Sequence, residues 1–186
     1  MSLKSSVFIA TSLDGYIARP DGDIEWLENA STEFPEGEDG GYSEFIKTID
    51  YIVMGRKSYE KVLSFDIPWP YEKPVIVLSR NSIAFPTELP KSVTWSKESP
   101  QELTSRLSQE GAERLYIDGG ITIQRFLSAG LIDDMTITLI PVILGAGISL
   151  FGEAEKDIPL KLVSSNASDF GIVQLTYEVE NTYVQR

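Results

Sequence analysis

The fold is decided by the stretch Tyr51-Ile-Val-Met-Gly-Arg-Lys-Ser-Tyr-Glu60, in which a short buried strand ends at a glycine and a helix follows directly. A strand that runs straight into a helix offers an anion the unpaired first-turn N–H groups and the positive end of the helix dipole. Gly55 lets a ligand approach the backbone, and the next three residues add two cations and a hydroxyl. This pattern predicts a phosphate or pyrophosphate site. The alternative is an ordinary strand–helix turn whose cations are solvated.

Composition limits the chemistry that the chain can perform. Its 186 residues are enough to bury a core, and we predict one domain over residues 1–186. The sequence contains neither Cys nor His, which excludes disulfides, thiolate or imidazole metal sites and histidine-based catalytic triads. We therefore predict no metal, and we expect carboxylates, Tyr, Lys or water to carry any proton transfer.

The net charge of −12 argues against a nucleic-acid partner or an anionic membrane, because both need a basic face on the protein. The apolar run Val7–Ala10 near the N-terminus is too short for a signal peptide or a membrane span. We therefore expect a cytoplasmic protein that binds a small molecule.

Strands and helices alternate as far as Gly130, and strands alone follow. Buried strands are expected at Val7–Ala10, Tyr51–Met54, Val75–Leu78, Val93–Trp95 and Leu115–Ile117. Helices are expected at about 41–50, around 59–63, from the capping box of Ser99 and Glu102 to Gly111, and around 123–127. Met135–Leu144 is expected to form one strand with Pro141 at an edge or bulge, and Leu160–Ala167 a hairpin with Ile172–Val179. This order predicts an α/β fold with a mostly parallel sheet of about eight strands and an antiparallel C-terminal edge.

Four unusual segments follow the carboxyl ends of these strands, where ligands bind in open α/β sheets. They are Ala10–Gly15, Gly55–Ser58, Ser79–Arg80 and Asp118–Gly120. Two are glycine turns that lead into helices, and two gather cations in an otherwise acidic chain. Their coincidence favours an extended ligand that carries phosphate groups. The Rossmann pattern G-x-G-x-x-G is absent, so a standard dinucleotide fold is not predicted.

Five strings of residues stand out along the chain. They are Ser12-Leu-Asp-Gly-Tyr-Ile-Ala18, Met54-Gly-Arg-Lys-Ser-Tyr59, Val77-Leu-Ser-Arg80, Ile117-Asp-Gly-Gly120 and Pro141-Val-Ile-Leu-Gly-Ala-Gly-Ile-Ser-Leu-Phe151. Together they resemble the dihydrofolate reductase-like superfamily. Within it, the chain is most similar to the C-terminal reductase domain of the bifunctional riboflavin-biosynthesis deaminase/reductase, from Val7 to about Val179. The resemblance implies a three-layer fold with helices on both faces of the sheet.

The resemblance also implies an NADPH site at the carboxyl ends of the strands. Gly55, Arg56, Lys57 and Ser58 correspond to the turn that binds the pyrophosphate and a nearby phosphate. Ser79 and Arg80 correspond to the strand end that contacts the adenosine 2′-phosphate, where added positive charge selects NADPH. Gly119 and Gly120 correspond to the turn beneath the pyrophosphate and nicotinamide ribose. Ala10, Asp14 and Gly15 correspond to the segment that flanks nicotinamide and substrate.

On the substrate side, the resemblance implies a carboxylate that supports protonation, on the helix before the Gly-Arg turn. Asp39 and Glu44 are the candidates there, and Asp14 is another acid near the reaction zone. Glu44 could equally be solvated, and Asp14 could equally cap its own turn. Predicted substrate contacts are Asp14, Gly15, Tyr16, Trp26 and Phe45. The aromatic side chains among them could equally belong to the core.

We interpret the chain as an NADPH-dependent reductase. It would transfer a hydride to a pteridine of the dihydrofolate type, or to a pyrimidine or ribosylaminopyrimidine of the riboflavin pathway type. The alternative is a nucleotide-binding module that keeps the cofactor site and has no catalytic activity. A homodimer is expected through the late strands, because the family often pairs there and the run Met135–Leu144 is apolar enough to need cover.

Overall fold

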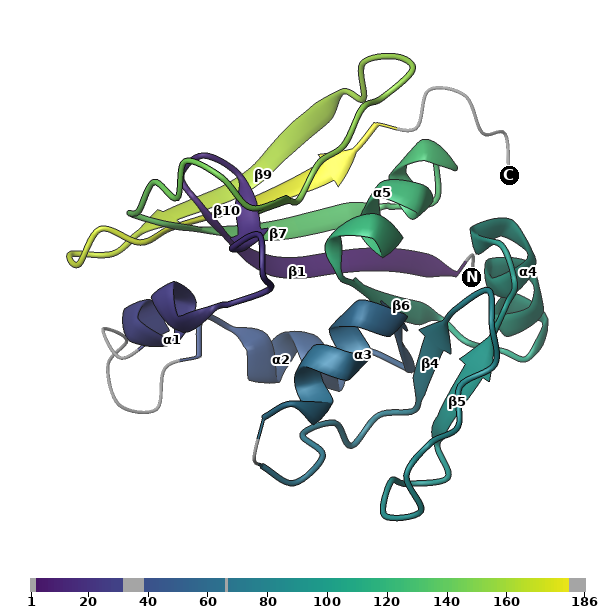
Figure 1. Ribbon diagram of the computed structural model, residues 1–186. Coiled ribbons are helices and arrows are strands. Elements are labelled where there is room, and N and C mark those ends of the chain that lie inside the picture. Colours follow the sequence, from purple (N-terminus) through teal and green to yellow (C-terminus); the bar gives the residue numbers. More distant parts are fainter. Residues whose placement is uncertain (1–2, 32–38, 66, 181–186) are drawn as a thin grey trace.

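Alternating apolar residues place one eight-stranded sheet at the centre of the protein, whose computed structural model describes residues 3–31, 39–65 and 67–180 (Figure 1). The strands are β1 (Lys4–Ser12), β3 (Tyr51–Gly55), β4 (Val75–Leu78), β5 (Val93–Ser96), β6 (Arg114–Asp118), β7 (Asp134–Ile140), β9 (Leu160–Ala167) and β10 (Val173–Val179). They lie in the order β5-β4-β3-β6-β1-β7-β10-β9. β10 runs antiparallel to both of its neighbours, and the other adjacent pairs are parallel. The predicted mostly parallel sheet with an antiparallel C-terminal edge is confirmed.

Helices cover both faces of the sheet, because successive residues of a strand point to opposite sides. They are α1 (Glu25–Ser31), α2 (Tyr42–Lys47), α3 (Arg56–Leu63), α4 (Pro100–Gln109) and α5 (Gly120–Ser128). In β3, Ile52 and Met54 pack in the core beneath α2 and α3, whereas Val53 packs in the core beneath α4 and α5. Within the residues that the structure describes, no helix is long and apolar enough to cross a membrane.

The prediction of a single strand from Met135 to Leu144 is wrong. β7 lies between β1 and β10 rather than at an edge, and it ends at Ile140. Pro141 lacks the N–H that a central strand needs, so the chain turns there, with the Val142 N–H donating to the Ile140 carbonyl at 2.7 Å. Further along, β8 (Ile148–Ser149) pairs with β2 (Tyr16–Ala18) in a small ribbon. The sequence patterns indicated neither this ribbon nor α1.

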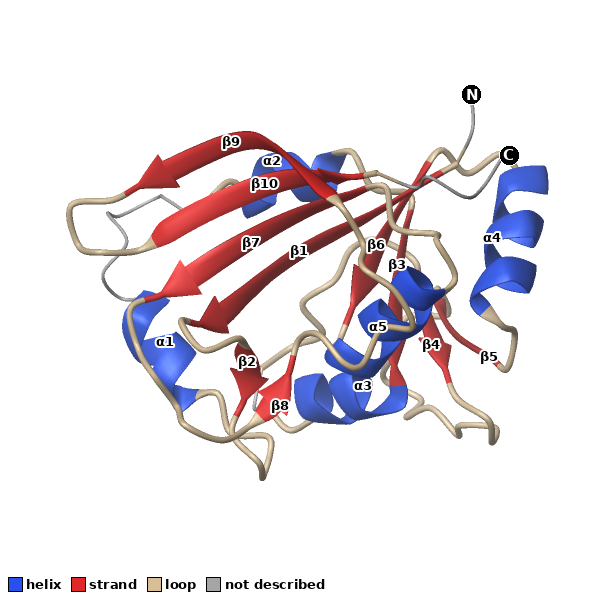
Figure 2. Cartoon of the chain, turned by 90° about the horizontal axis from the view of Figure 1, so that it is seen from above, coloured by secondary structure: helices blue, strands red, loops and turns tan. Residues whose placement is uncertain are grey.

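The two neighbours of β1 separate from it at different points. β1 pairs with β7 from Ser6 to Ser12 but with β6 only from Lys4 to Ser6. Beyond Ser6, β1 and β6 diverge towards their carboxyl ends (Figure 2). The chain also crosses over here, since α5 leads from β6 on one side of β1 to β7 on the other. Such a switch point is the place where open α/β sheets bind their ligands.

Candidate functional site

Two helices begin at the carboxyl edge of the sheet without a side-chain cap. α3 follows β3 at Gly55 and α5 follows β6 at Gly119, and these two strands are neighbours. By contrast, Ser99 caps α4 in the predicted capping box, and Asp39 accepts N–H groups at the start of α2. The first-turn N–H groups of α3 and α5 therefore remain available to an anion.

Both glycines are required by the close approach of the two turns. A Cβ built on Gly119 lies 2.2 Å from the Ser58 hydroxyl oxygen, and one built on Gly55 lies 2.8 Å from the Thr122 hydroxyl oxygen. Gly119 also has a φ of 86°, which side chains rarely tolerate. On the other side, a Cβ on Gly120 would lie 3.0 Å from a methyl group of Ile17 in β2. The glycine pair thus holds α5 between α3 and the β2–β8 ribbon.

Three cations predicted to bind phosphate lie near this edge. Arg56 forms an ion pair with Glu60 at 2.6 Å. Lys57 and Arg80 are exposed, and within residues 3–31, 39–65 and 67–180 neither forms an ion pair. The backbone before Arg80 is fixed, because the Ser79 N–H donates to a carbonyl of β5 and the Ser79 carbonyl accepts an indole N–H. The side chains of Lys57 and Arg80 are therefore free to reach a ligand.

Asp118, at the end of β6, is an acid that the sequence prediction did not include among the catalytic candidates. Tyr116 lies two residues earlier on the same face of the strand, and its hydroxyl is 3.3 Å from Asp118 Oδ1. The same hydroxyl donates to the carbonyl of Phe8 in β1 at 3.0 Å. Burial raises the pKa of Asp118, against the opposite effects of the Gly119 N–H and the Tyr116 hydroxyl. Asp118 thus keeps its proton to a higher pH than an ordinary carboxyl group.

Two further phenols approach Asp118 from segments that are remote in the sequence. Tyr42 begins α2, and Tyr71 lies between α3 and β4. Burial raises the pKa of Tyr42 to about 12, with smaller contributions from Asp118 and Asp39. Burial and then Asp118 also raise the pKa of Tyr71. Protonated phenols therefore surround an acid at the point where β1 and β6 diverge, which is an arrangement suited to proton transfer.

Asp14, which the sequence placed among the catalytic and substrate-binding residues, ties two loops together. Its carboxylate accepts the Ser12 hydroxyl at 2.6 Å, the Leu144 N–H at 3.1 Å and the Gly145 N–H at 2.8 Å. These bonds, that of Ser12 foremost, lower the pKa of Asp14. Gly15, with a φ of 84°, then turns the chain into β2. The geometry gives Asp14 a structural role and makes it a poor proton donor.

The two carboxylates predicted near α2 have different surroundings. Asp39 accepts the Gly41 N–H at 3.0 Å and the Ser43 N–H at 2.7 Å. The Ser43 side chain, followed by the backbone N–H groups of Ser43 and Gly41, lowers the pKa of Asp39. Glu44 is largely exposed and pairs with Lys47 one turn along the helix. Asp39 is thus an anion at the start of α2, and Glu44 faces solvent.

The predicted aromatic contacts pack into the body of the protein. Phe45 stacks on Phe8 at 4.9 Å between ring centroids and meets the ring of Tyr116 edge-on at 5.2 Å. Phe45 therefore packs against the rings of Tyr116 and Tyr42, both of which lie near Asp118. Trp26 is buried in a cluster with Ile140, Ile172 and the predicted site residue Ala10. Tyr16 is half-buried in the β2–β8 ribbon.

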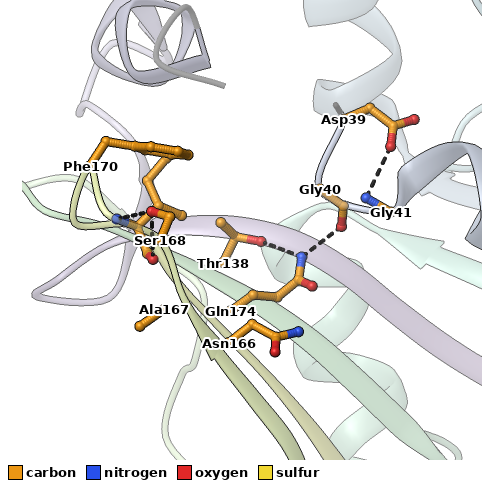
Figure 3. A pocket seen from close by; sticks show the side chains of 10 residues that line it. Asp39, Gly40, Gly41, Thr138, Asn166, Ala167, Ser168, Phe170 and Gln174 are labelled. Atoms are coloured by element: carbon orange, nitrogen blue, oxygen red, sulfur yellow. Dashed lines mark hydrogen bonds between the residues drawn. The ribbon is translucent and has the colours of Figure 1, made fainter. Parts of the chain in front are cut away.

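A pocket of about 600 Å³ lies between the start of α2 and the ends of β7, β9 and β10 (Figure 3). The Gln174 side-chain amide lies at its wall and donates to the Gly40 carbonyl at 2.8 Å and to the Thr138 hydroxyl at 3.1 Å. Thr138 is paired in register with Ala10 of β1. Gly41, another lining residue, directly precedes Tyr42. The pocket therefore adjoins the group of tyrosines around Asp118.

Comparisons with known proteins agree with this architecture. The RibD C-terminal domain family matches residues 5–174. YwjB of Bacillus subtilis (strain 168) is 38% identical over 180 residues, which span 95% of this chain and 98% of YwjB. A crystal structure of a Shewanella sp. PV-4 protein assigned to riboflavin biosynthesis has a TM-score of 0.90 and 40% identity, covering 96% of this chain and 99% of that one.

Dihydrofolate reductase from Enterococcus faecalis shares the fold at a TM-score of 0.63 and 18% identity, covering 95% of this chain and 96% of the reductase. The family match and this likeness confirm the resemblance that the five strings of residues suggested. The chain therefore belongs to the RibD C-terminal domain family and has the reductase-type fold of the dihydrofolate reductase-like superfamily.

Proposed function

We propose that this protein is an NADPH-dependent reductase whose substrate is a planar nitrogen heterocycle of the pteridine or pyrimidine type. The observation that carries the proposal is the position of Asp118, a half-buried acid with a raised pKa beside two uncapped helix starts. Membership of the RibD C-terminal domain family supports it. So does the likeness in fold to an Enterococcus faecalis dihydrofolate reductase complexed with NADP(H).

The residues at the carboxyl edge fit this cofactor. The uncapped N–H groups of α3 and α5 suit a pyrophosphate, and the turns at Gly55 and Gly119 leave the backbone accessible. Lys57 and Arg80 offer charge to further phosphate groups, of which NADPH has one more than NADH. When bound, NADPH supplies a hydride from its nicotinamide ring.

Asp118 supplies the proton that must accompany the hydride. Reduction of a carbon–nitrogen double bond adds the hydride to carbon and a proton to nitrogen, and leaves Asp118 as a carboxylate until water reprotonates it. Tyr116 has a single hydroxyl proton, and its nearer acceptor is the carbonyl of Phe8. The same hydroxyl also lies within donating distance of Asp118 Oδ1, at 3.3 Å, and so helps to hold the carboxyl group in place.

Arg80→Ala tests the cofactor assignment. Calorimetry should show NADPH binding to the unmodified protein, and saturation at about 100 times Kd should stabilise it by roughly 3 kcal/mol. The variant should bind NADPH about tenfold or more weakly, with NADH affinity unchanged, because a charge-assisted contact to the 2′-phosphate is lost. Arg125→Ala, which removes an exposed cation from the last turn of α5, is the control. Equal loss of NADPH and NADH affinity would contradict the role of Arg80.

Turnover tests the role of Asp118. NADPH oxidation is followed with dihydrofolate and with aminopyrimidine substrates, and Asp118→Asn should lower kcat by about 100-fold or more while NADPH affinity stays the same. Full activity of the variant would exclude Asp118 as the acid. NADPH binding without oxidation by any of these compounds would favour a nucleotide-binding module over a reductase.

A further inference from the structure

The pocket beside α2 differs in charge from the carboxyl ends of β3 and β4, where the proposed cofactor contacts lie. Asp39 is the only charged residue among the described residues that line it. The cations Arg56, Lys57 and Arg80 follow β3 and β4, and two strands, β6 and β1, separate β3 from β7 at the pocket. The positive charge of this edge is therefore concentrated on one half of the sheet, and the pocket lies on the other half.

Several hydrogen-bond donors of the pocket already have acceptors within the protein. The N–H groups of Gly41 and Ser43 at the start of α2 donate to the Asp39 carboxylate. The Gln174 side-chain amide donates to a carbonyl and to the Thr138 hydroxyl, and the Ser168 hydroxyl donates to the carbonyl of Ile172. Among the described lining residues, a phosphate would meet an anion and no Lys or Arg, so the hydration of its charge would be poorly replaced.

The remaining surfaces of the pocket suit a different kind of ligand. Asp39 is exposed, and its carboxylate oxygens can accept further hydrogen bonds from amino groups. Phe170 and Ile172 line the pocket with apolar surface against which a ring can lie. The Asn166 amide at the end of β9 offers both a donor and an acceptor (Figure 3).

We propose that this pocket binds a nitrogen heterocycle that carries amino groups and no phosphate group. The proposal rests on the proposed function, because it names the substrate class of the same site. It sets this chain apart from a reductase whose substrate is a phosphorylated ribosylaminopyrimidine. The discriminating features are Asp39, which repels a phosphate, and the absence of a Lys or Arg among the described lining residues.

Calorimetry on the full chain tests the proposal, with 2,4-diaminopyrimidine, pterin, cytidine and cytidine 5′-monophosphate as probes. Each is titrated into the protein alone and into the protein saturated with NADPH. We expect at least one of the three unphosphorylated compounds to bind, and the monophosphate to bind at least about tenfold more weakly than cytidine or not at all. Tighter binding of the monophosphate than of cytidine, or binding by none of the unphosphorylated compounds, would overturn the proposal.

Asn166→Arg sharpens the test, because this exposed lining residue can present a cation without disturbing the core. The variant should raise the affinity for cytidine 5′-monophosphate about tenfold. Asp157→Asn, an exposed carboxylate before β9 and outside the lining, should leave every probe affinity unchanged. An Asn166→Arg protein with unchanged monophosphate affinity would count against the pocket as the binding site. Failure of NADPH to bind would remove the proposed function, while the titrations without NADPH would still decide the chemistry of the pocket.

Discussion

The ionised form of Asp118 destabilises the folded protein, and the same surroundings help Asp118 to keep its proton. Its pKa is raised by burial, so the folded protein binds this proton more tightly than the unfolded chain does. The stability that protonation contributes is complete below the ordinary carboxyl pKa of 3.8 and is lost as the pH rises through the raised value. Above that value the folded protein carries a half-buried carboxylate that is only partly hydrated.

Asp118→Asn should therefore increase the melting temperature at about pH 8, and the increase should shrink as the pH falls towards about 4, because more of the native carboxyl group is protonated there. Thermal unfolding at both pH values measures the difference. A variant that melts below the unmodified protein at the higher pH would show that the surroundings stabilise the charge of Asp118. The result would also remove the case for Asp118 as an acid.

Asp118 and the tyrosines near it show which properties of single residues can be predicted from the sequence and which cannot. The turns at Gly55 and Gly119 were predictable because each is local, consisting of a strand end, a glycine and a helix start. Asp118 acquires its raised pKa from burial beside Tyr42 and Tyr71, which arrive from distant segments. The one local signal was an acid two residues after a tyrosine on a buried strand, which places both side chains on one face.

Asp14 should behave in the opposite way to Asp118. Its pKa is lowered, foremost by the Ser12 hydroxyl, so its contribution to stability is present above the ordinary carboxyl pKa and is lost as the pH falls through the lowered value. Asp14→Asn should lower the melting temperature at about pH 7, and the difference should shrink towards about pH 2.5. Asp157→Asn serves as the control at both pH values. An equal difference at both pH values would mean that the carboxylate charge does not hold the two loops together.

At the scale of elements, the proposed cofactor site depends on the contact between the starts of α3 and α5. Gly119→Ala introduces both an unfavourable φ and a clash with Ser58, whereas Gly111→Ala introduces only the unfavourable φ, since nothing lies within 4 Å of its Cβ. Backbone strain of this kind costs about 1–3 kcal/mol, and Gly119→Ala should cost more than Gly111→Ala.

A double-mutant cycle separates the backbone strain of Gly119→Ala from its clash with Ser58. Ser58→Ala removes the hydroxyl that lies 2.2 Å from the new Cβ and leaves the Ser58 Cβ at 3.4 Å. The double variant should recover at least about 0.5 kcal/mol relative to the sum of the single variants in urea unfolding. Strict additivity would show that the two turns move apart at no cost.

Elements whose sequence signals lie within a few residues were predictable. Elements that form only by pairing between distant segments were not. The capping box at Ser99 and the hairpin of β9 and β10 are both present, because their signals lie within a few residues. The β2–β8 ribbon joins strands of three and two residues that are about 130 positions apart, so neither strand has a pattern of its own. Pro141 ends β7 because the strand is central, and its neighbours could be known only from the sheet order.

At the scale of the whole molecule, β9 leaves an open edge. All eight of its residues are exposed, and Leu160, Leu162 and Val163 are apolar with exposed fractions of 40%, 52% and 55%. One side of the strand pairs with β10, while its other backbone edge ends the sheet. Proteins normally cover such an edge or interrupt it with charges, because unpaired strands associate with other chains.

We therefore expect a homodimer in which a second copy covers β9, with an interface of about 1,200 Å² or more in total. The double substitution Leu162→Lys and Val163→Lys puts a charge on each face of the strand and should give a monomer in size-exclusion chromatography with light scattering. Ile67→Lys, which adds one lysine at an apolar residue with a 58% exposed fraction outside the sheet, should leave the dimer intact. A monomeric unmodified protein at micromolar concentration would refute the dimer. Dissociation by Ile67→Lys, with the β9 double variant still dimeric, would instead locate the interface near Ile67.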